Sequence, residues 1–145
     1  MDLFEFLCCR KAGYVFANCG LNVIEFPKTW LFSSTNKMVV EMNPAFISQS
    51  APYWLECFLE ECEGIPNTEE ADLEDLLEWS GFILMYIQLT EHLAGPELWN
   101  RIDIPRMMGC YDTLHTLSNQ VAKEVILQDY SKVNQAKMEV YGKYV

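Results

Sequence analysis

The segment from Leu73 to Leu93 constrains the fold most, because a helix built from it is apolar over most of its circumference from Trp79 onward. Its large side chains recur at spacings of three and four residues along two separate faces. A helix that is apolar on so many sides is typical of a central element with several neighbours. Gly81 would let one of these neighbours approach closely. The first face carries Leu73, Leu76, Leu77, Ile83, Leu84 and Ile87, and the second carries Trp79, Phe82, Tyr86, Leu89 and Leu93.

The first 43 residues predict a different kind of structure. A short apolar start, Leu3 to Cys9, is compatible with a helix. Runs rich in Val, Ile, Phe and Trp follow, each bounded by residues that favour turns. We interpret these runs as the strands of a small antiparallel β meander. They are Tyr14 to Ala17, Leu21 to Phe26, Thr29 to Ser33 and Met38 to Met42.

From residue 44 onward the spacing of apolar residues is helical. Ser50 is a predicted N-cap, with Pro52 just inside its helix. Pro105 fits the first position of a helix covering Met107 to Leu117. Ser118 is a predicted N-cap for the last long helix.

Length and composition indicate one folded domain. The chain has 145 residues, of which 50% are hydrophobic and 21% are charged, so it can bury enough apolar surface to offset its ordering entropy. Intrinsic disorder is excluded for most of it. We predict a single domain (1–145) of the α+β, helix-dominated class, in which the β meander (1–43) packs on a bundle of about four helices (44–145).

The N-terminus and the cysteines predict a cytoplasmic protein. The first residues carry acids where a secretory signal would carry Lys or Arg, and the longest strongly apolar stretch, Gly81 to Leu89, is too short to span a membrane. Six cysteines are too few for a secreted disulfide scaffold of this length. We therefore expect reduced thiols and no membrane contact.

Motifs whose spacing implies a mechanism are absent from the sequence. There is no CxxC pair, no HxxxH, no Gly-rich phosphate loop and no GxSxG elbow. Cys57 and Cys62 are interpreted as core thiols. Cys110 and His115 fall on different faces of their predicted helix, which disfavours a catalytic dyad. His115, one turn after Tyr111, is interpreted as a hydrogen-bonded packing residue or a cation at a helix end. We expect no metal and no cofactor.

Negative charge is concentrated in one part of the chain. The 63 residues between Lys37 and Arg101 contain no Lys or Arg but 13 Asp and Glu, while the whole chain has a net charge of −11. This balance disfavours direct contact with nucleic acid. One interpretation is a solvated face, and the other is a docking face for a basic partner, which would relieve the repulsion between the acids. The predicted partner-binding residues are Glu56, Glu60, Glu61, Glu63, Glu69, Glu70, Asp72, Glu74, Asp75 and Glu78.

A resemblance covers about a third of the chain, from Trp79 to Tyr130. It rests on Trp79, Gly81, Phe82, Tyr86, Thr90 and Ile102, on the run Tyr111-Asp112-Thr113-Leu114-His115-Thr116, and on Val121 and Ile126. In these residues the chain resembles a family of small, uncharacterised bacterial proteins found in predicted toxin–antitoxin-type cassettes. Members are often encoded beside proteins resembling ADP-ribosyltransferases. The resemblance implies an antitoxin or accessory role and carries over no catalytic residue, although it marks Tyr111, Asp112 and His115 as motif residues.

We therefore expect a non-enzymatic interaction module that docks an acidic face on a basic protein partner, such as a toxin. Two alternatives remain open at this point: a nucleic-acid-mimicking phage or anti-defence protein, and a small enzyme that uses His115. Tyrosines on the final helix leave a homo-oligomer open as well.

Overall fold

Helices make up the fold in every part of the chain that the structure describes. The structure, a computed structural model, describes residues 1–19, 26–62 and 73–132. No β-strand occurs in these ranges, where an isolated antiparallel bridge joins Ile102 to Ser131. The predicted α+β class is therefore wrong, and the fold is all-helical. Its helices are α1 (Leu3–Cys19), α2 (Phe26–Leu31), α3 (Ser34–Val40), α4 (Pro44–Ile47), α5 (Ala51–Glu61), α6 (Glu74–Glu91), α7 (Gly95–Arg101), α8 (Ile104–Gly109), α9 (Tyr111–Leu114) and α10 (Asn119–Asp129).

The predicted β meander is replaced by helices. The run Tyr14 to Ala17 lies in α1, which begins with the predicted helical start and continues through it. The run Thr29 to Ser33 overlaps α2, and Met38 to Met42 overlaps α3. The remaining run, Leu21 to Phe26, lies outside the described residues except for Phe26, which begins α2. Local strand propensity is overridden here because the runs bury Val15, Phe16, Trp30 and Val39 against other helices.

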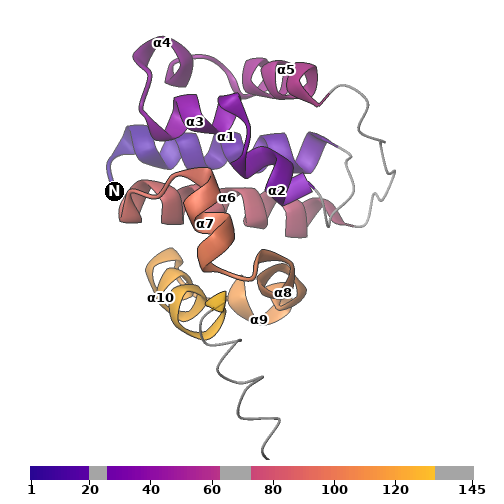
Figure 1. Ribbon diagram of the computed structural model, residues 1–145, viewed down its shortest axis with the longest axis vertical. Helices are drawn as coiled ribbons and strands as arrows, with labels where there is room; N and C mark the ends of the chain where they lie inside the picture. Colours follow the sequence, from indigo (N-terminus) through magenta and orange to yellow (C-terminus); the bar gives the residue numbers. More distant parts are fainter. Residues whose placement is uncertain (20–25, 63–72, 133–145) are drawn as a thin grey trace, which may run out of the picture.

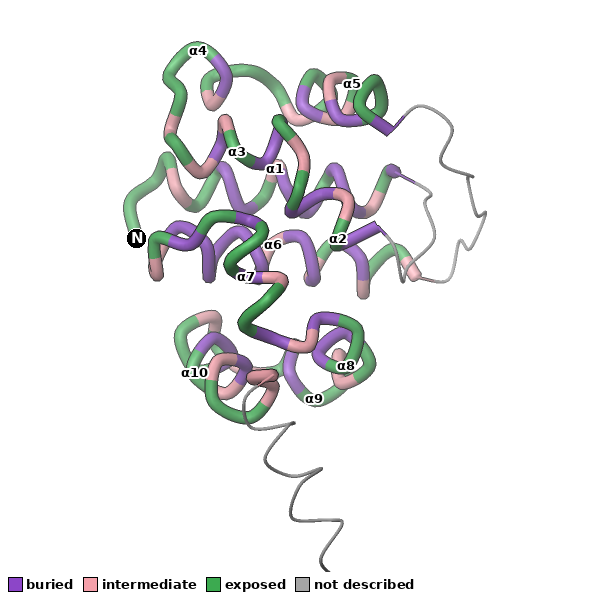
Figure 2. The backbone as a smooth tube through the Cα atoms, in the orientation of Figure 1, coloured by how far each residue is buried: buried purple, intermediate pink, exposed green. Residues whose placement is uncertain are grey.

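Helix α6 is the central element, as its two apolar faces predict. It packs against α1 on one side and α10 on the other, and α5 covers the far side of α1 (Figure 1). Figure 2 shows that α6 is buried along most of its length, whereas the first turns of α1 are exposed. None of the described helices is long and apolar enough to cross a bilayer.

Two glycines set the close approach of α1 and α6. A Cβ placed on Gly81 of α6 would lie 2.6 Å from the carbonyl oxygen of Ala12 and 2.8 Å from the ring of Phe16. A Cβ on Gly13 of α1 would lie 2.8 Å from the carbonyl oxygen of Glu78. Each helix therefore presents a bare backbone position to the other, which confirms the close neighbour predicted at Gly81.

A cluster of buried aromatic rings joins α2 to α1 and α5. Phe16 of α1 contacts Phe26 and Trp30 of α2, with ring centroids 4.4 and 6.0 Å apart. Phe58 of α5 contacts the same two rings at 5.5 and 5.3 Å. These edge-to-face contacts bury apolar area and add to it about 0.5–1.5 kcal/mol per pair. They explain how a helix of six residues is held in place.

The predicted helix starts are confirmed, and one predicted helix is divided. Ser50 caps α5 by accepting a hydrogen bond from the Tyr53 amide, and Ser118 caps α10 by accepting one from the Val121 amide. The helix predicted over Met107 to Leu117 is instead two short helices, α8 and α9. The break falls at Cys110, which is the C-cap of α8 and the N-cap of α9.

Candidate functional site

The predicted acidic residues that the structure describes fall on two helices, which lie on either side of α1. Glu56, Glu60 and Glu61 belong to α5, and Glu74, Asp75 and Glu78 begin α6. Helix α1 packs against both of these helices and lies between them in Figure 1. The described acids thus form two separate groups. The other predicted partner-binding residues, Glu63, Glu69, Glu70 and Asp72, lie outside the described residues.

Glu61 is engaged within the fold. Its carboxylate accepts hydrogen bonds from the Ser34 amide at 2.7 Å, the Thr35 amide at 3.1 Å and the Thr35 hydroxyl at 2.5 Å. Partial burial acts to raise the pKa of Glu61, but these hydrogen bonds outweigh it and hold the pKa below its ordinary value. Glu61 therefore joins α5 to the start of α3 and has little capacity left for a partner.

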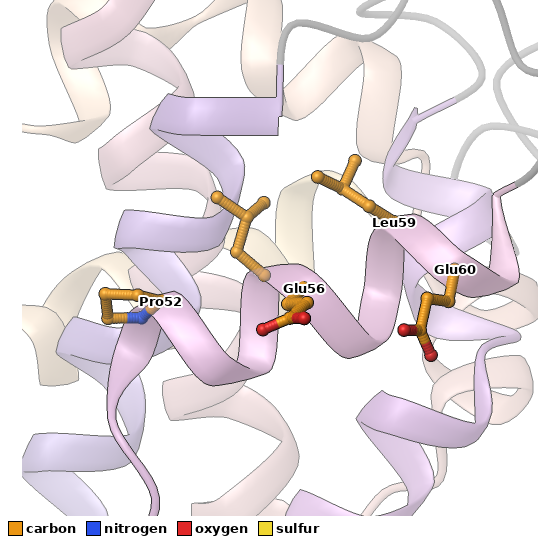
Figure 3. A pocket seen from close by; sticks show the side chains of 5 residues that line it. Pro52, Glu56, Leu59 and Glu60 are labelled. Carbon is orange, nitrogen blue, oxygen red and sulfur yellow. The ribbon is translucent and has the colours of Figure 1, made fainter.

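The other two acids of α5 border an open hollow on the outer face of that helix. Figure 3 shows Glu56 and Glu60 on the same side of α5, about one turn apart. The hollow has a volume of about 550 Å³, and its described lining comes entirely from α5. Pro52, Leu55 and Leu59 supply its apolar part. This hollow carries negative charge but no aromatic side chain among its described lining residues.

The acids of α6 border a second hollow, which draws residues from several helices. Asp75 and Glu78 line it together with Trp79 and Phe82 of the same helix. Phe6 of α1, Tyr111 of α9 and Asn119 of α10 complete the described lining, and the volume is about 470 Å³. We name this hollow the acidic-aromatic groove. It brings together the acidic residues and the Tyr111 motif, which the sequence presents as separate features.

Ring contacts fix the aromatic walls of the groove. Phe6 meets Phe82 edge to face with centroids 5.7 Å apart, and Trp79 meets Tyr111 in the same way at 5.7 Å. All four rings keep some exposed surface. Asp75 and Glu78 are exposed beside them, and their spacing of three residues places both carboxylates on one face of α6. The described lining contains no Lys or Arg.

Of the motif residues, Tyr111 lines the groove and His115 packs against the Tyr111 ring. His115 stacks on Tyr111 with centroids 4.3 Å apart, and its Nδ1 lies 2.7 Å from the Tyr111 carbonyl oxygen. An imidazole held by this carbonyl donates from Nδ1. Asp112 is exposed. Cys110 hydrogen-bonds to Tyr130, the C-cap of α10, and this hydrogen bond raises the pKa of the Tyr130 phenol.

A third hollow, of about 320 Å³, lies where α3 meets the start of α7. Leu31, Phe32, Val40 and Pro96 supply apolar lining, and Lys37 and Glu41 bring one charge of each sign. Among the described residues, no group of three or more His, Cys, Asp or Glu side chains is placed to hold a metal ion. Of these three hollows, the acidic-aromatic groove is the one whose described lining joins two carboxylates to four aromatic rings.

Sequence reasoning finds part of this groove. Asp75, Glu78 and Tyr111 are predicted site residues, whereas Trp79 is predicted as part of an apolar stripe. Phe6 and Asn119 are not predicted, because only the packing of α1 and α10 beside α6 brings them to the groove. The chain matches no family model, no curated protein and no solved structure in the comparisons made.

Proposed function

We propose that this chain is a protein-interaction module that binds a cationic segment of a basic partner in the acidic-aromatic groove. The observation that supports the proposal is the meeting of two carboxylates, Asp75 and Glu78, with four partly exposed aromatic rings in one hollow of about 470 Å³. This combination matches the chemistry of an arginine or lysine side chain.

Aromatic faces and carboxylates act on a cation in complementary ways. A guanidinium or ammonium group over a Trp or Tyr ring gains about 0.5–1 kcal/mol when exposed and about 2 kcal/mol when desolvated. A carboxylate beside it adds a charge-assisted hydrogen bond, which is bidentate for arginine. Trp79 and Tyr111 offer the rings, and Asp75 and Glu78 offer the carboxylates. The net charge of −11 would also steer a basic partner toward the chain.

The hollow on α5 fits this role less well. Glu56 and Glu60 supply the same charge as the groove acids, but its described lining offers only aliphatic groups beside them. Surface ion pairs without further contacts contribute about 0–1 kcal/mol. The α5 hollow therefore provides a matched control for the effect of charge alone.

Isothermal titration calorimetry, in which a capped oligo-arginine peptide is added to the protein at low salt, tests the proposal. The variant Asp75→Asn/Glu78→Gln and the control Glu56→Gln/Glu60→Gln each remove two negative charges. We expect the groove variant to weaken binding about tenfold or more, which corresponds to about 1.4 kcal/mol, and the control to weaken it about twofold. Trp79→Ala should also weaken binding. Equal losses in the two double variants would mean that net charge alone attracts the peptide, and the proposal would be wrong.

A toxin-type partner, as the resemblance implies, is a special case of this proposal. A toxin that handles nucleotides or RNA presents cationic side chains in its substrate groove, and a partner bound there would block it. Co-purification of such a toxin with the wild-type chain, and its loss with Asp75→Asn/Glu78→Gln, would support this case.

A further inference from the structure

The first two turns of α1 expose an apolar patch that no other described part of the chain covers. Leu3 and Phe4 are each 68% exposed, Phe6 is 40% exposed and Leu7 is 37% exposed. We name these residues the N-terminal patch. Large contiguous apolar surfaces on soluble proteins commonly mark interaction sites.

Helix geometry places the patch beside the acidic-aromatic groove. At 100° per residue, Leu3 and Leu7 fall opposite the side of α1 that is buried, and Phe6 falls at the edge of this exposed side. Phe6 contacts Phe82 of α6 and lines the groove. The patch and the groove therefore share one residue and form a continuous surface.

Charges border the patch on defined sides. Asp2 accepts a hydrogen bond from the Glu5 amide at the start of α1, so two acids flank its N-terminal end. Asp75 and Glu78 flank it across the groove. Arg10 is exposed one turn beyond Leu7 and ends the apolar stretch along α1. A ligand that covers the patch therefore meets the negative charges of Asp75 and Glu78 at the groove, while Arg10 lies one turn further along α1.

We propose that the cationic segment of the partner is an amphipathic helix, which lays an apolar face on the N-terminal patch and places a basic side chain in the groove. This inference rests on the proposed function and names the form of its partner. Apolar residues at i, i+3, i+4 and i+7 make one helical face, and a basic residue at the edge of that face lies beside it. A helix of about three turns spans about 16 Å, which is enough to cross a patch of two turns.

Charge complementarity favours this occupant over a second copy of the chain. A second copy would bring its own acids and a net charge of −11 to a surface that already carries acids. Repulsion between like charges disfavours that pairing. A basic amphipathic helix instead pairs opposite charges while it covers the apolar residues.

Three capped peptide probes and two single variants test this inference. One probe places Leu at i, i+3, i+4 and i+7 with Arg at the other positions, the second scrambles the same composition so that no apolar face forms, and the third is oligo-arginine. Leu3→Ser removes an anchor of the N-terminal patch. Leu59→Ser is the matched control, because Leu59 is 44% exposed on α5.

The amphipathic probe is expected to bind more tightly than the scrambled probe and to gain helical circular dichroism on binding. Leu3→Ser should weaken binding of the amphipathic probe roughly tenfold, as loss of a buried leucine contact does, and should leave binding of oligo-arginine unchanged. Leu59→Ser should change the binding of neither the amphipathic probe nor oligo-arginine.

The outcomes separate this inference from the proposed function. If oligo-arginine binds through Asp75 and Glu78 but the amphipathic probe binds no better than the scrambled one, the helical partner is overturned and the groove function stands. If no probe binds, both are overturned. Sedimentation that shows a wild-type dimer and a Leu3→Ser monomer would show a second copy on the patch and overturn the inference.

Discussion

Asn36 of α3 and Gln88 of α6 exchange two hydrogen bonds inside the core. The Asn36 amide nitrogen donates to Gln88 Oε1 at 2.8 Å, and the Gln88 amide nitrogen donates to Asn36 Oδ1 at 3.0 Å. Both side chains are buried, at 1% and 0% exposure. Because each amide satisfies the other, the pair fixes how α3 sits on the central helix.

Replacement of Gln88 by Leu should destabilise the protein by about 1–3 kcal/mol, because the Asn36 amide is left buried without its partner. Urea unfolding with linear extrapolation measures this loss. The double variant Asn36→Leu/Gln88→Leu removes both polar groups, so it should recover part of the lost stability. If the double variant loses at least as much stability as the two single variants lose together, the two amides do not act as a pair.

Gly81→Ala should destabilise the fold by about 2 kcal/mol or more, because an added Cβ overpacks the interface between α1 and α6. Its nearest neighbour, the Ala12 carbonyl oxygen at 2.6 Å, is backbone and cannot rotate away. Gly109→Ala is the matched control, since a Cβ there has no neighbour within 4 Å. We expect that control to leave stability unchanged or to raise it by up to about 1 kcal/mol. In thermal melts, Gly81→Ala should unfold at a lower temperature than Gly109→Ala. Equal melting temperatures would contradict the close packing of α1 and α6.

The parts of the fold that sequence reasoning predicts correctly depend on residues close together in the chain. Ser50 and Ser118 act on amides three residues away, and the apolar faces of α6 repeat within single turns. The N-terminal error arises where the outcome depends on distant residues. Phe26 and Trp30 of α2 are four residues apart, which suits one face of a helix. Their contacts with the distant Phe16 and Phe58 favour the helix over a strand.

The candidate site follows the same division. Its charges are visible in the sequence, because a run of acids without Lys or Arg is plain to read. The sequence does not show that the aromatic residues meet at these charges, because Phe6, Trp79 and Tyr111 come together only through the packing of α1, α6 and α9. The engagement of Glu61 by α3 is also hidden, since its partners lie 26 and 27 residues away.

The rate at which the cysteines are alkylated should fall as their burial increases. Burial raises the pKa of the Cys9 and Cys19 thiols to about 12 and that of Cys62 to about 11, so very little reactive thiolate is present near neutral pH. Cys57 and Cys110 are only half-buried. Brief treatment of the native protein with iodoacetamide at about pH 8, followed by peptide mapping, should modify Cys57 and Cys110 first. Modification of Cys9 as fast as Cys57 would show that α1 opens in the native state.

Glu61 should make the free energy of unfolding depend on pH. Because its pKa in the folded protein lies below the ordinary value of 4.5, its carboxylate contributes stability that is fully present above that pH. The contribution is lost as the pH falls through the folded pKa, since protonation removes the acceptor that the Ser34 and Thr35 groups need. Glu61→Gln should cost about 1 kcal/mol at pH 7, a typical value for a lost helix cap, and the cost should shrink toward pH 3.

Urea midpoints of the wild type and Glu61→Gln, measured from pH 7 to pH 3, check this expectation. Glu60→Gln is the control, because Glu60 is an adjacent acid that lines the open α5 hollow. It removes the same charge and should leave the midpoint almost unchanged at pH 7. A Glu61→Gln cost that stays constant down to pH 3 would mean that the hydrogen bonds to α3 do not require the ionised carboxylate.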